Sequence, residues 1–172
     1  NNSNNTFVAT KRGYGLLFNT EEIPVTGLKA SGVKSINLKD DEVVSGSIFD
    51  DNKEYITILT HKGTGKRIKV KDFKKSTRAR RGLQIIREVK TNPYYIIKVF
   101  VINSKKEIGI ISNNELNFIK ITELPIADRY SVGSSIVKNE IQNVFTRRDS
   151  EESEESVVEE SIQPQIPPPY PF

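Results

Sequence analysis

Two glycines and two adjacent cations occur together in the segment THKGTGKR, residues 60–67, directly after an apolar run of strand length. A phosphate-binding P-loop needs a glycine, four residues and then Gly-Lys-Ser/Thr, so that backbone amides surround a triphosphate and a hydroxyl group reaches magnesium. Here Thr60 stands at the first glycine position and Arg67 at the hydroxyl position. Because two of the four fixed positions fail, the pattern favours a hairpin turn, in which glycine supplies a positive φ.

Other catalytic and metal-binding side chains are scarce. The chain has no cysteine and a single histidine, His61, which excludes thiolate chemistry and a histidine-rich metal site. The pairs Asp40-Asp41 and Asp50-Asp51 suggest metal or acid–base chemistry, but both lie where the pattern predicts turns, and Asp is frequent in turns. We therefore predict no catalytic residue, no metal site and no cofactor on this chain.

The charges are distributed very unevenly along the chain. All 26 Lys and Arg lie at or before Arg148, whereas seven of the 22 Asp and Glu lie after it, so residues 1–148 carry +11 and residues 149–172 carry −7. A segment as basic as residues 1–148, called the basic body below, is expected to bind an anionic partner. The alternative is an ordinary solvated, charged surface.

The elements that must position these cations are predicted to be strands. Val, Ile, Thr, Phe and Tyr form short runs bounded by Gly, Asn, Asp and Lys, such as residues 55–59 and 94–102. This pattern is typical of an all-β domain. Before residue 148 no segment has convincing helical periodicity, and no stretch of about eighteen apolar residues is present to span a membrane as a helix.

The chain also contains an internal repeat of about fifty residues. TKRGYGLLF, THKGTGKRI and SNNELNFIK begin at Thr10, Thr60 and Ser112. A second landmark glycine follows each copy by 22, 22 and 21 residues, at Gly32, Gly82 and Gly133. Repeats of this size, each with several strands, predict blades arranged around an axis, here about residues 6–54, 55–105 and 106–148.

Cations recur near the landmarks, which predicts a basic rim that follows the phosphate backbone of a nucleic acid. Each of these cations alone could equally be a solvated surface residue, so the prediction rests on their clustering. The candidate DNA contacts are Arg12, Lys29, Lys34, Lys62, Lys66, Arg67, Arg78, Arg80, Arg81 and Arg129.

The segments THKGTGKR and GVKSINLKDDEVV resemble the repeat of the C-terminal domains of bacterial type IIA topoisomerase A subunits. The resemblance covers about residues 6–146 and implies three consecutive blades of a β-pinwheel. Family members carry five or six blades, so preceding blades are expected to be missing. The segment KASGVKSINLKDD is more similar to the topoisomerase IV A subunit of a Gram-positive bacterium than to gyrase.

The resemblance implies a non-catalytic domain that binds duplex DNA on its outer edge, bends it and presents it to a catalytic core. The family's nucleophilic tyrosine lies elsewhere, and the six tyrosines here match no part of its motif. Gyrase wraps DNA through a Gln-Arg-Arg-Gly-Gly-Lys-Gly box, of which Arg80-Arg81-Gly82 is only a fragment. The implied partners are duplex DNA, the catalytic N-terminal part of the same polypeptide, and the topoisomerase IV B subunit in a heterotetramer that uses ATP and Mg. The implied location is the cytoplasm, at the nucleoid, with no membrane contact.

Two alternatives remain open: the equivalent DNA-wrapping domain of the gyrase A subunit, and a propeller-type scaffold for protein interactions. The +11 body favours DNA, because a protein scaffold has no need of one sign of charge at equivalent positions. Residues 149–172, rich in Ser, Glu and Pro, are predicted to be a disordered tail. That tail is either a solubilising end or a competitor of DNA for the basic rim.

Overall fold

The computed structural model describes residues 4–22, 40–76, 82–103 and 105–146. These segments form antiparallel β-sheets, joined by single turns of 3-10 helix and by loops, and contain no α-helix. The predicted all-β, propeller-like class is confirmed, with three sheets as the blades. The predicted tail lies outside the described residues. No helix in the described segments is long and apolar enough to cross a membrane.

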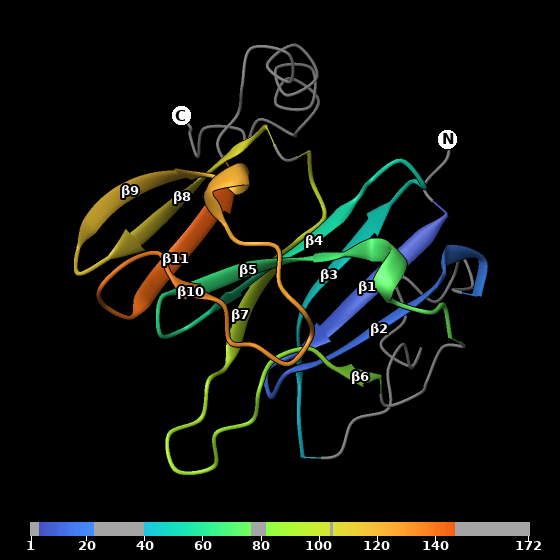
Figure 1. Ribbon diagram of the computed structural model, residues 1–172, viewed down its shortest axis with the longest axis horizontal. Coiled ribbons are helices and arrows are strands. Elements are labelled where there is room, and N and C mark those ends of the chain that lie inside the picture. Colours follow the sequence, from blue (N-terminus) through green and yellow to red (C-terminus); the bar gives the residue numbers. More distant parts are fainter. Residues whose placement is uncertain (1–3, 23–39, 77–81, 104, 147–172) are drawn as a thin grey trace, which may run out of the picture.

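Each sheet is built on a β-hairpin, and the second sheet lies between the first and the third (Figure 1). The first sheet has the order β3 (Val43–Phe49), β1 (Asn5–Thr10), β2 (Tyr14–Asn19), β6 (Leu83–Gln84). The second has the order β10 (Ser134–Ser135), β5 (Thr64–Lys69), β4 (Tyr55–Thr60), β7 (Ile96–Phe100). The third has the order β11 (Ile141–Thr146), β8 (Glu107–Ser112), β9 (Glu115–Lys120).

The hairpin turns follow the repeated motif. Gly13 and Gly63 have φ values of 103° and 89°, which residues with a side chain rarely adopt. The predicted hairpin turn after Thr60 is therefore confirmed. The third hairpin is one residue shorter. Its turn is formed by Asn113 and Asn114, with φ values of 53° and 61°, and Asn is the residue other than glycine that best tolerates this conformation.

Adjacent sheets exchange strands. β6 follows the second hairpin in sequence but pairs with β2 of the first sheet, and β10 follows the third hairpin but pairs with β5 of the second. We call residues 82–86 and 133–137 the crossing segments. Each begins at a landmark glycine with a positive φ, 93° at Gly82 and 88° at Gly133. These two landmark glycines therefore mark the points where one repeat joins the preceding sheet, whereas Gly32 lies outside the described residues.

The glycines of the hairpins make room for these crossing segments. A Cβ added to Gly13 would collide with Ile86, and one added to Gly15 would collide with Phe7 and come within 3.1 Å of Ile85. In the next sheet, a Cβ on Gly63 would lie 2.7 Å from the carbonyl oxygen of Val137. The Gly-x-Gly spacing is thus a receptor for the apolar residues that follow each crossing strand.

The core lies between neighbouring sheets. Phe7, Ala9 and Leu17 of the first sheet pack with Ile56 and Ile58 of the second in one cluster. A separate cluster joins the second sheet to the third, through Leu59 and Phe100 on one side and buried isoleucines of β8 on the other. Burial of each isoleucine contributes about 2 kcal/mol, so face-to-face packing supplies much of the stability.

Candidate nucleic-acid interface

The ten predicted DNA contacts fall into three groups. Lys29, Lys34, Arg78, Arg80 and Arg81 lie outside the described residues. Lys66 and Arg67 are buried within β5. Arg12 is exposed, and Lys62 and Arg129 are half-buried, each held by neighbouring groups.

Lys66 and Arg67 bind protein groups. The Lys66 ammonium, fully buried, donates hydrogen bonds to the carbonyl oxygens of Asp128, Arg129 and Ser131 at 2.9, 3.0 and 2.5 Å. Its burial lowers its pKa to about 8. Because an ammonium enclosed in this way has no surface to offer a phosphate, we remove Lys66 from the candidate contacts.

The Arg67 side chain holds the same stretch of chain. Its guanidinium donates to the carbonyl oxygens of Leu124 and Thr122 at 3.0 and 3.3 Å and lies over the ring of Tyr55 at 4.9 Å. Both cations were predicted to lie on a turn, whereas they lie in the strand that receives the third repeat. Arg67 is therefore removed as well.

Arg12 and Lys62 lie on the hairpin turns of the first and second sheets. The Arg12 guanidinium donates to the carbonyl oxygen of Asp40 at 3.2 Å, and its backbone N–H donates to the Asp41 carboxylate at 3.0 Å. The Lys62 ammonium donates to the Asn92 carbonyl oxygen at 2.6 Å and lies 4.2 Å from the centre of the Tyr94 ring. Both cations remain near the surface, where a phosphate would compete with these partners.

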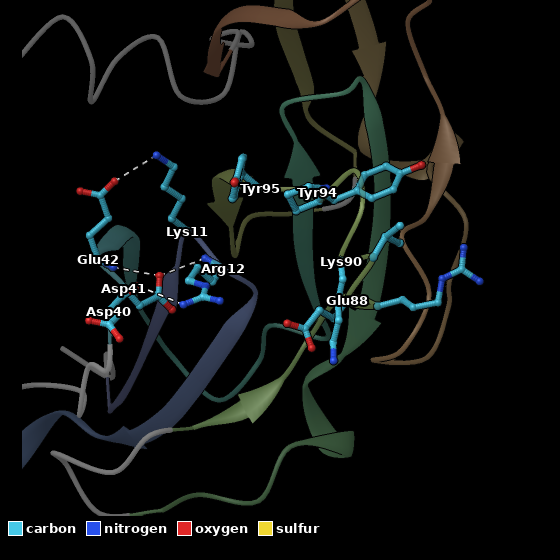
Figure 2. A pocket seen from close by; sticks show the side chains of 12 residues that line it. Lys11, Arg12, Asp40, Asp41, Glu42, Glu88, Lys90, Tyr94 and Tyr95 are labelled. Carbon is cyan, nitrogen blue, oxygen red and sulfur yellow. Dashed lines mark hydrogen bonds and ion pairs between the residues drawn. The ribbon is translucent and has the colours of Figure 1, made fainter.

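A cavity of about 770 Å³ separates the first turn from residues 87–95 (Figure 2). In this turn cavity, Lys11 pairs with Glu42 at 3.5 Å on one side, while Glu88 and Lys90 lie on the other. Its lining carries four cations and four carboxylates, so it offers an anion little net attraction. The charged lining residues are Lys11, Arg12, Arg87, Lys90, Asp40, Asp41, Glu42 and Glu88.

Tyr95 ties the two turns together. Its backbone N–H donates to His61 Nδ1 at 3.0 Å, and its carbonyl oxygen accepts from the His61 backbone N–H at 2.8 Å. The next residue, Ile96, donates to the carbonyl oxygen of Lys11 at 2.9 Å. The single histidine is thus part of the junction between sheets. This role was not predicted from the sequence. The one sequence signal near it is the Tyr94-Tyr95 pair at the start of an apolar run of strand length.

A second cavity, of about 970 Å³, has a different charge balance. Lys74, Lys75 and Arg129 line it together with a single carboxylate, Asp72. We call this cavity the basic groove. Ser76 and Gly82 both line it, and the five residues between them in the sequence, which lie outside the described residues, include Arg78, Arg80 and Arg81. Lys74 and Lys75 precede these arginines in the sequence but were not among the predicted contacts.

The basic groove continues into a smaller cavity that shares Lys75 and adds Lys53 and Lys71. The carboxylates of Asp50 and Asp51 line this extension, and Asp51 accepts a hydrogen bond from the Asn5 side chain at 2.8 Å. This bond, with smaller contributions from the Asn4 side chain and from Lys75, lowers the Asp51 pKa. Cations still outnumber carboxylates along the combined surface.

Arg129 joins the basic groove to the crossing segments. Its guanidinium donates to the Gln84 carbonyl oxygen at 3.0 Å and to the Tyr130 hydroxyl at 3.2 Å. Those bonds fix one edge of the side chain at the junction of three repeats. Among the described residues, no group of three or more His, Asp and Glu side chains is placed to hold a metal ion.

The family model described as "DNA gyrase C-terminal domain, beta-propeller" matches residues 4–49 and 54–103. The A subunit of DNA topoisomerase 4 from Bacillus subtilis (strain 168) is 38% identical over 136 residues, which are 78% of this chain and 17% of that protein. The corresponding protein of Staphylococcus aureus is 34% identical over 131 residues, 76% of this chain and 16% of that protein. The chain thus spans about a sixth of the length of these curated relatives.

Solved structures of the same two kinds of domain have a similar fold. The crystal structure of the C-terminal domain of DNA topoisomerase IV superposes with a TM-score of 0.80 at 32% identity, covering 94% of this chain and 52% of that one. The DNA gyrase A C-terminal domain superposes with a TM-score of 0.73 at 16% identity, covering 85% and 51%, which shows the shared fold. The chain therefore belongs to the family of C-terminal β-pinwheel domains of type IIA topoisomerase A subunits, of the kind found in topoisomerase IV of Gram-positive bacteria.

Proposed function

We propose that this chain is the duplex-DNA-binding part of a topoisomerase IV A subunit, and that the basic groove is its principal contact with DNA. One observation carries this proposal: three cations and a single carboxylate line the groove, and three further arginines lie in the segment that joins its two ends in sequence. The turn cavity, with balanced charges, is a weaker candidate.

The mechanism is electrostatic. Lys and Arg contact phosphates and release condensed counterions, which gives binding that weakens steeply with salt and depends little on base sequence. The chain itself cleaves no DNA. It holds and bends a duplex for ATP-dependent strand passage by the complete enzyme, which decatenates and relaxes DNA during chromosome segregation.

The partners that follow from this role are the catalytic N-terminal part of the same polypeptide and the topoisomerase IV B subunit. ATP and Mg act in those other parts, and the complex works in the cytoplasm, at the nucleoid. The topoisomerase IV assignment is preferred to gyrase because this chain is 32% identical to the solved topoisomerase IV domain and 16% identical to the gyrase domain.

The test compares two pairs of exposed cations. Replacement of Lys74 and Lys75 by Ala is expected to weaken binding of the chain to fluorescent duplexes of two unrelated sequences equally, and to reduce the salt slope by about one unit per lost contact. The matched control replaces Arg87 and Lys90, which removes the same charge from the turn cavity. Binding that is insensitive to salt would refute the mechanism. A control pair that weakens binding as much as the lysine pair would move the interface to the turn cavity.

A further inference from the structure

The loop at residues 128–132 is fixed by side chains along its length. Lys66 donates to three of its carbonyl oxygens, and the Thr64 hydroxyl donates to the last one at 2.6 Å. The Asp128 carboxylate accepts from the backbone N–H groups of the second and third residues after it, at 2.9 and 3.1 Å. We call residues 128–132 the clasped loop. Six side-chain hydrogen bonds therefore hold its backbone in one conformation.

Tyr130 lies at the centre of the clasped loop and is 56% exposed, more than any other large hydrophobic side chain of the described segments. The Arg129 guanidinium lies against its ring, with its carbon 4.9 Å from the ring centre, and donates to its hydroxyl group at 3.2 Å. An exposed ring on a fixed backbone loses little conformational freedom when it binds a partner. Tyr130 is therefore a preorganised aromatic contact.

The surroundings of Tyr130 combine cations with apolar surface. Arg129 also lines the basic groove and donates to the carbonyl oxygen of Gln84 at 3.0 Å. Leu83, the residue before Gln84, lines the same groove and is 40% exposed. Binding of phosphates requires only cations, whereas a whole nucleotide offers both a phosphate and the flat face of a base. An exposed aromatic ring beside cations therefore suits a nucleotide whose base is accessible.

We propose that Tyr130 stacks on a nucleobase where the base stack of the bound DNA opens, and that the basic groove therefore prefers locally opened DNA to a regular duplex. This inference rests on the proposed function, in which the groove holds a bent duplex. In a regular duplex each base face is covered by its neighbours, but it becomes accessible at a kinked step or an unpaired nucleotide. Because the Arg129 guanidinium lies against one face of the ring, the base stacks on the opposite face.

The test compares two short duplexes of the same sequence, one of which carries an additional, unpaired 2-aminopurine in its centre. We expect this chain to bind the duplex with the unpaired base about tenfold more tightly, as is typical for stacking of one base on an aromatic side chain. The fluorescence of 2-aminopurine should fall on binding, because stacking on the ring quenches it. Intact duplex is titrated in the same buffer at two salt concentrations.

Variants of Tyr130 separate the ring from its hydroxyl group. Tyr130→Ala should remove both the preference and the quenching, and should leave the affinity for the regular duplex unchanged. Tyr130→Phe keeps the ring and loses only the acceptor of the Arg129 hydrogen bond, so it should keep both effects. The matched control is Ile126→Ala, which shortens a side chain that is 48% exposed but lies outside the lining of the basic groove, and it should change neither.

Three results would overturn the proposal. Equal affinity of the parent chain for the two duplexes would show that no base is recognised. A preference that survives Tyr130→Ala would place the stacking contact elsewhere. An equal loss of affinity for both duplexes in Tyr130→Ala would identify Tyr130 as a general contact to the duplex. A chain that binds neither duplex would refute the proposed function, whereas salt-dependent binding of both with equal affinity would refute this inference alone.

Discussion

Lys66 shows how a charged side chain can act as a structural clasp. Its ammonium satisfies three carbonyl oxygens of the loop at residues 128–131, which otherwise would be left without these donors. We expect Lys66→Met to lower the free energy of unfolding by about 3 kcal/mol, since hydrogen bonds to a buried charge are among the stronger ones. Lys69→Met, in the same strand but only half-buried, is the control and should change it by less than about 0.5 kcal/mol. Urea denaturation measures both, and equal effects would contradict the clasp.

The pKa of Lys66 adds a pH dependence with a definite sign. Burial lowers the pKa to about 8 in the folded chain, from 10.5 for an unperturbed lysine. Between these values the unfolded chain binds more protons, so this group makes stability rise with pH, by at most about 1.4 kcal/mol per pH unit. The difference in stability between the parent chain and Lys66→Met should therefore grow from pH 8 towards pH 10.5. A difference that stays constant over this window would show that the pKa is not lowered.

The three arginines between Ser76 and Gly82 in the sequence are predicted contacts that lie outside the described residues. Simultaneous replacement of Arg78, Arg80 and Arg81 by Ala should weaken duplex binding equally for different sequences, because phosphates carry no base identity. The salt slope should fall by about one unit per lost contact. Circular dichroism checks that the fold survives. Unchanged DNA affinity would remove these arginines from the interface and leave Lys74 and Lys75 to be tested alone.

At the scale of elements, the glycines of the hairpins are receptors as well as turn formers. Gly63→Ala must adopt a φ of 89° and would place its Cβ 2.7 Å from the Val137 carbonyl oxygen and 2.9 Å from that of Asn139. We expect a loss of about 2–4 kcal/mol in the free energy of unfolding, from backbone strain and displacement of the crossing segment. Gly46→Ala is the control, because its Cβ would meet only the Phe7 carbonyl oxygen, at 3.6 Å. If both variants unfolded at the same urea concentration, the receptor role would be wrong.

The strands themselves were predictable, but their exchange between sheets was not. Runs such as residues 55–59 and the repeated Thr-x-x-Gly motif predict hairpins, because strand patterning and turn glycines are local signals. Pairing of β6 with β2 joins residues that lie about seventy positions apart, and nothing in the local pattern records it. The same limit explains Lys66 and Arg67. Adjacent cations after a glycine resemble an exposed turn, whereas in the structure residues 122–131 of the third repeat cover them.

At the scale of the whole molecule, the crossing segments connect three sheets into one structure. Lys66 in the second sheet binds the loop that carries Arg129, and Arg129 in turn donates to Gln84, which belongs to the strand paired with the first sheet. A continuous series of hydrogen bonds therefore links the two junctions. The sequence predicted the sign of the surface charge, because the excess of cations before Arg148 can be counted without any structure. It did not predict the separation into a charge-balanced turn cavity and a basic groove, which depends on which carboxylates lie nearby.

The overall charge distribution leads to a last prediction, about residues 149–172. This segment carries −7 and is joined to a body that carries +11. If it is a flexible tether, as its composition predicts, its effective concentration at the basic groove reaches about the millimolar range, which is enough to compete with DNA phosphates. Truncation after Arg148 should therefore tighten DNA binding at low salt, and the gain should shrink as added salt screens the attraction.

The control for this truncation keeps the length of the segment and removes its charge, by replacement of its seven carboxylates with the corresponding amides. If charge is responsible, the amide variant should bind DNA as tightly as the truncated chain, and titration of all three chains at two salt concentrations measures the effect. A gain seen only on truncation would show that the tail obstructs DNA by its bulk. Identical affinities of the intact and truncated chains at low salt would show that the acidic segment has no part in DNA binding.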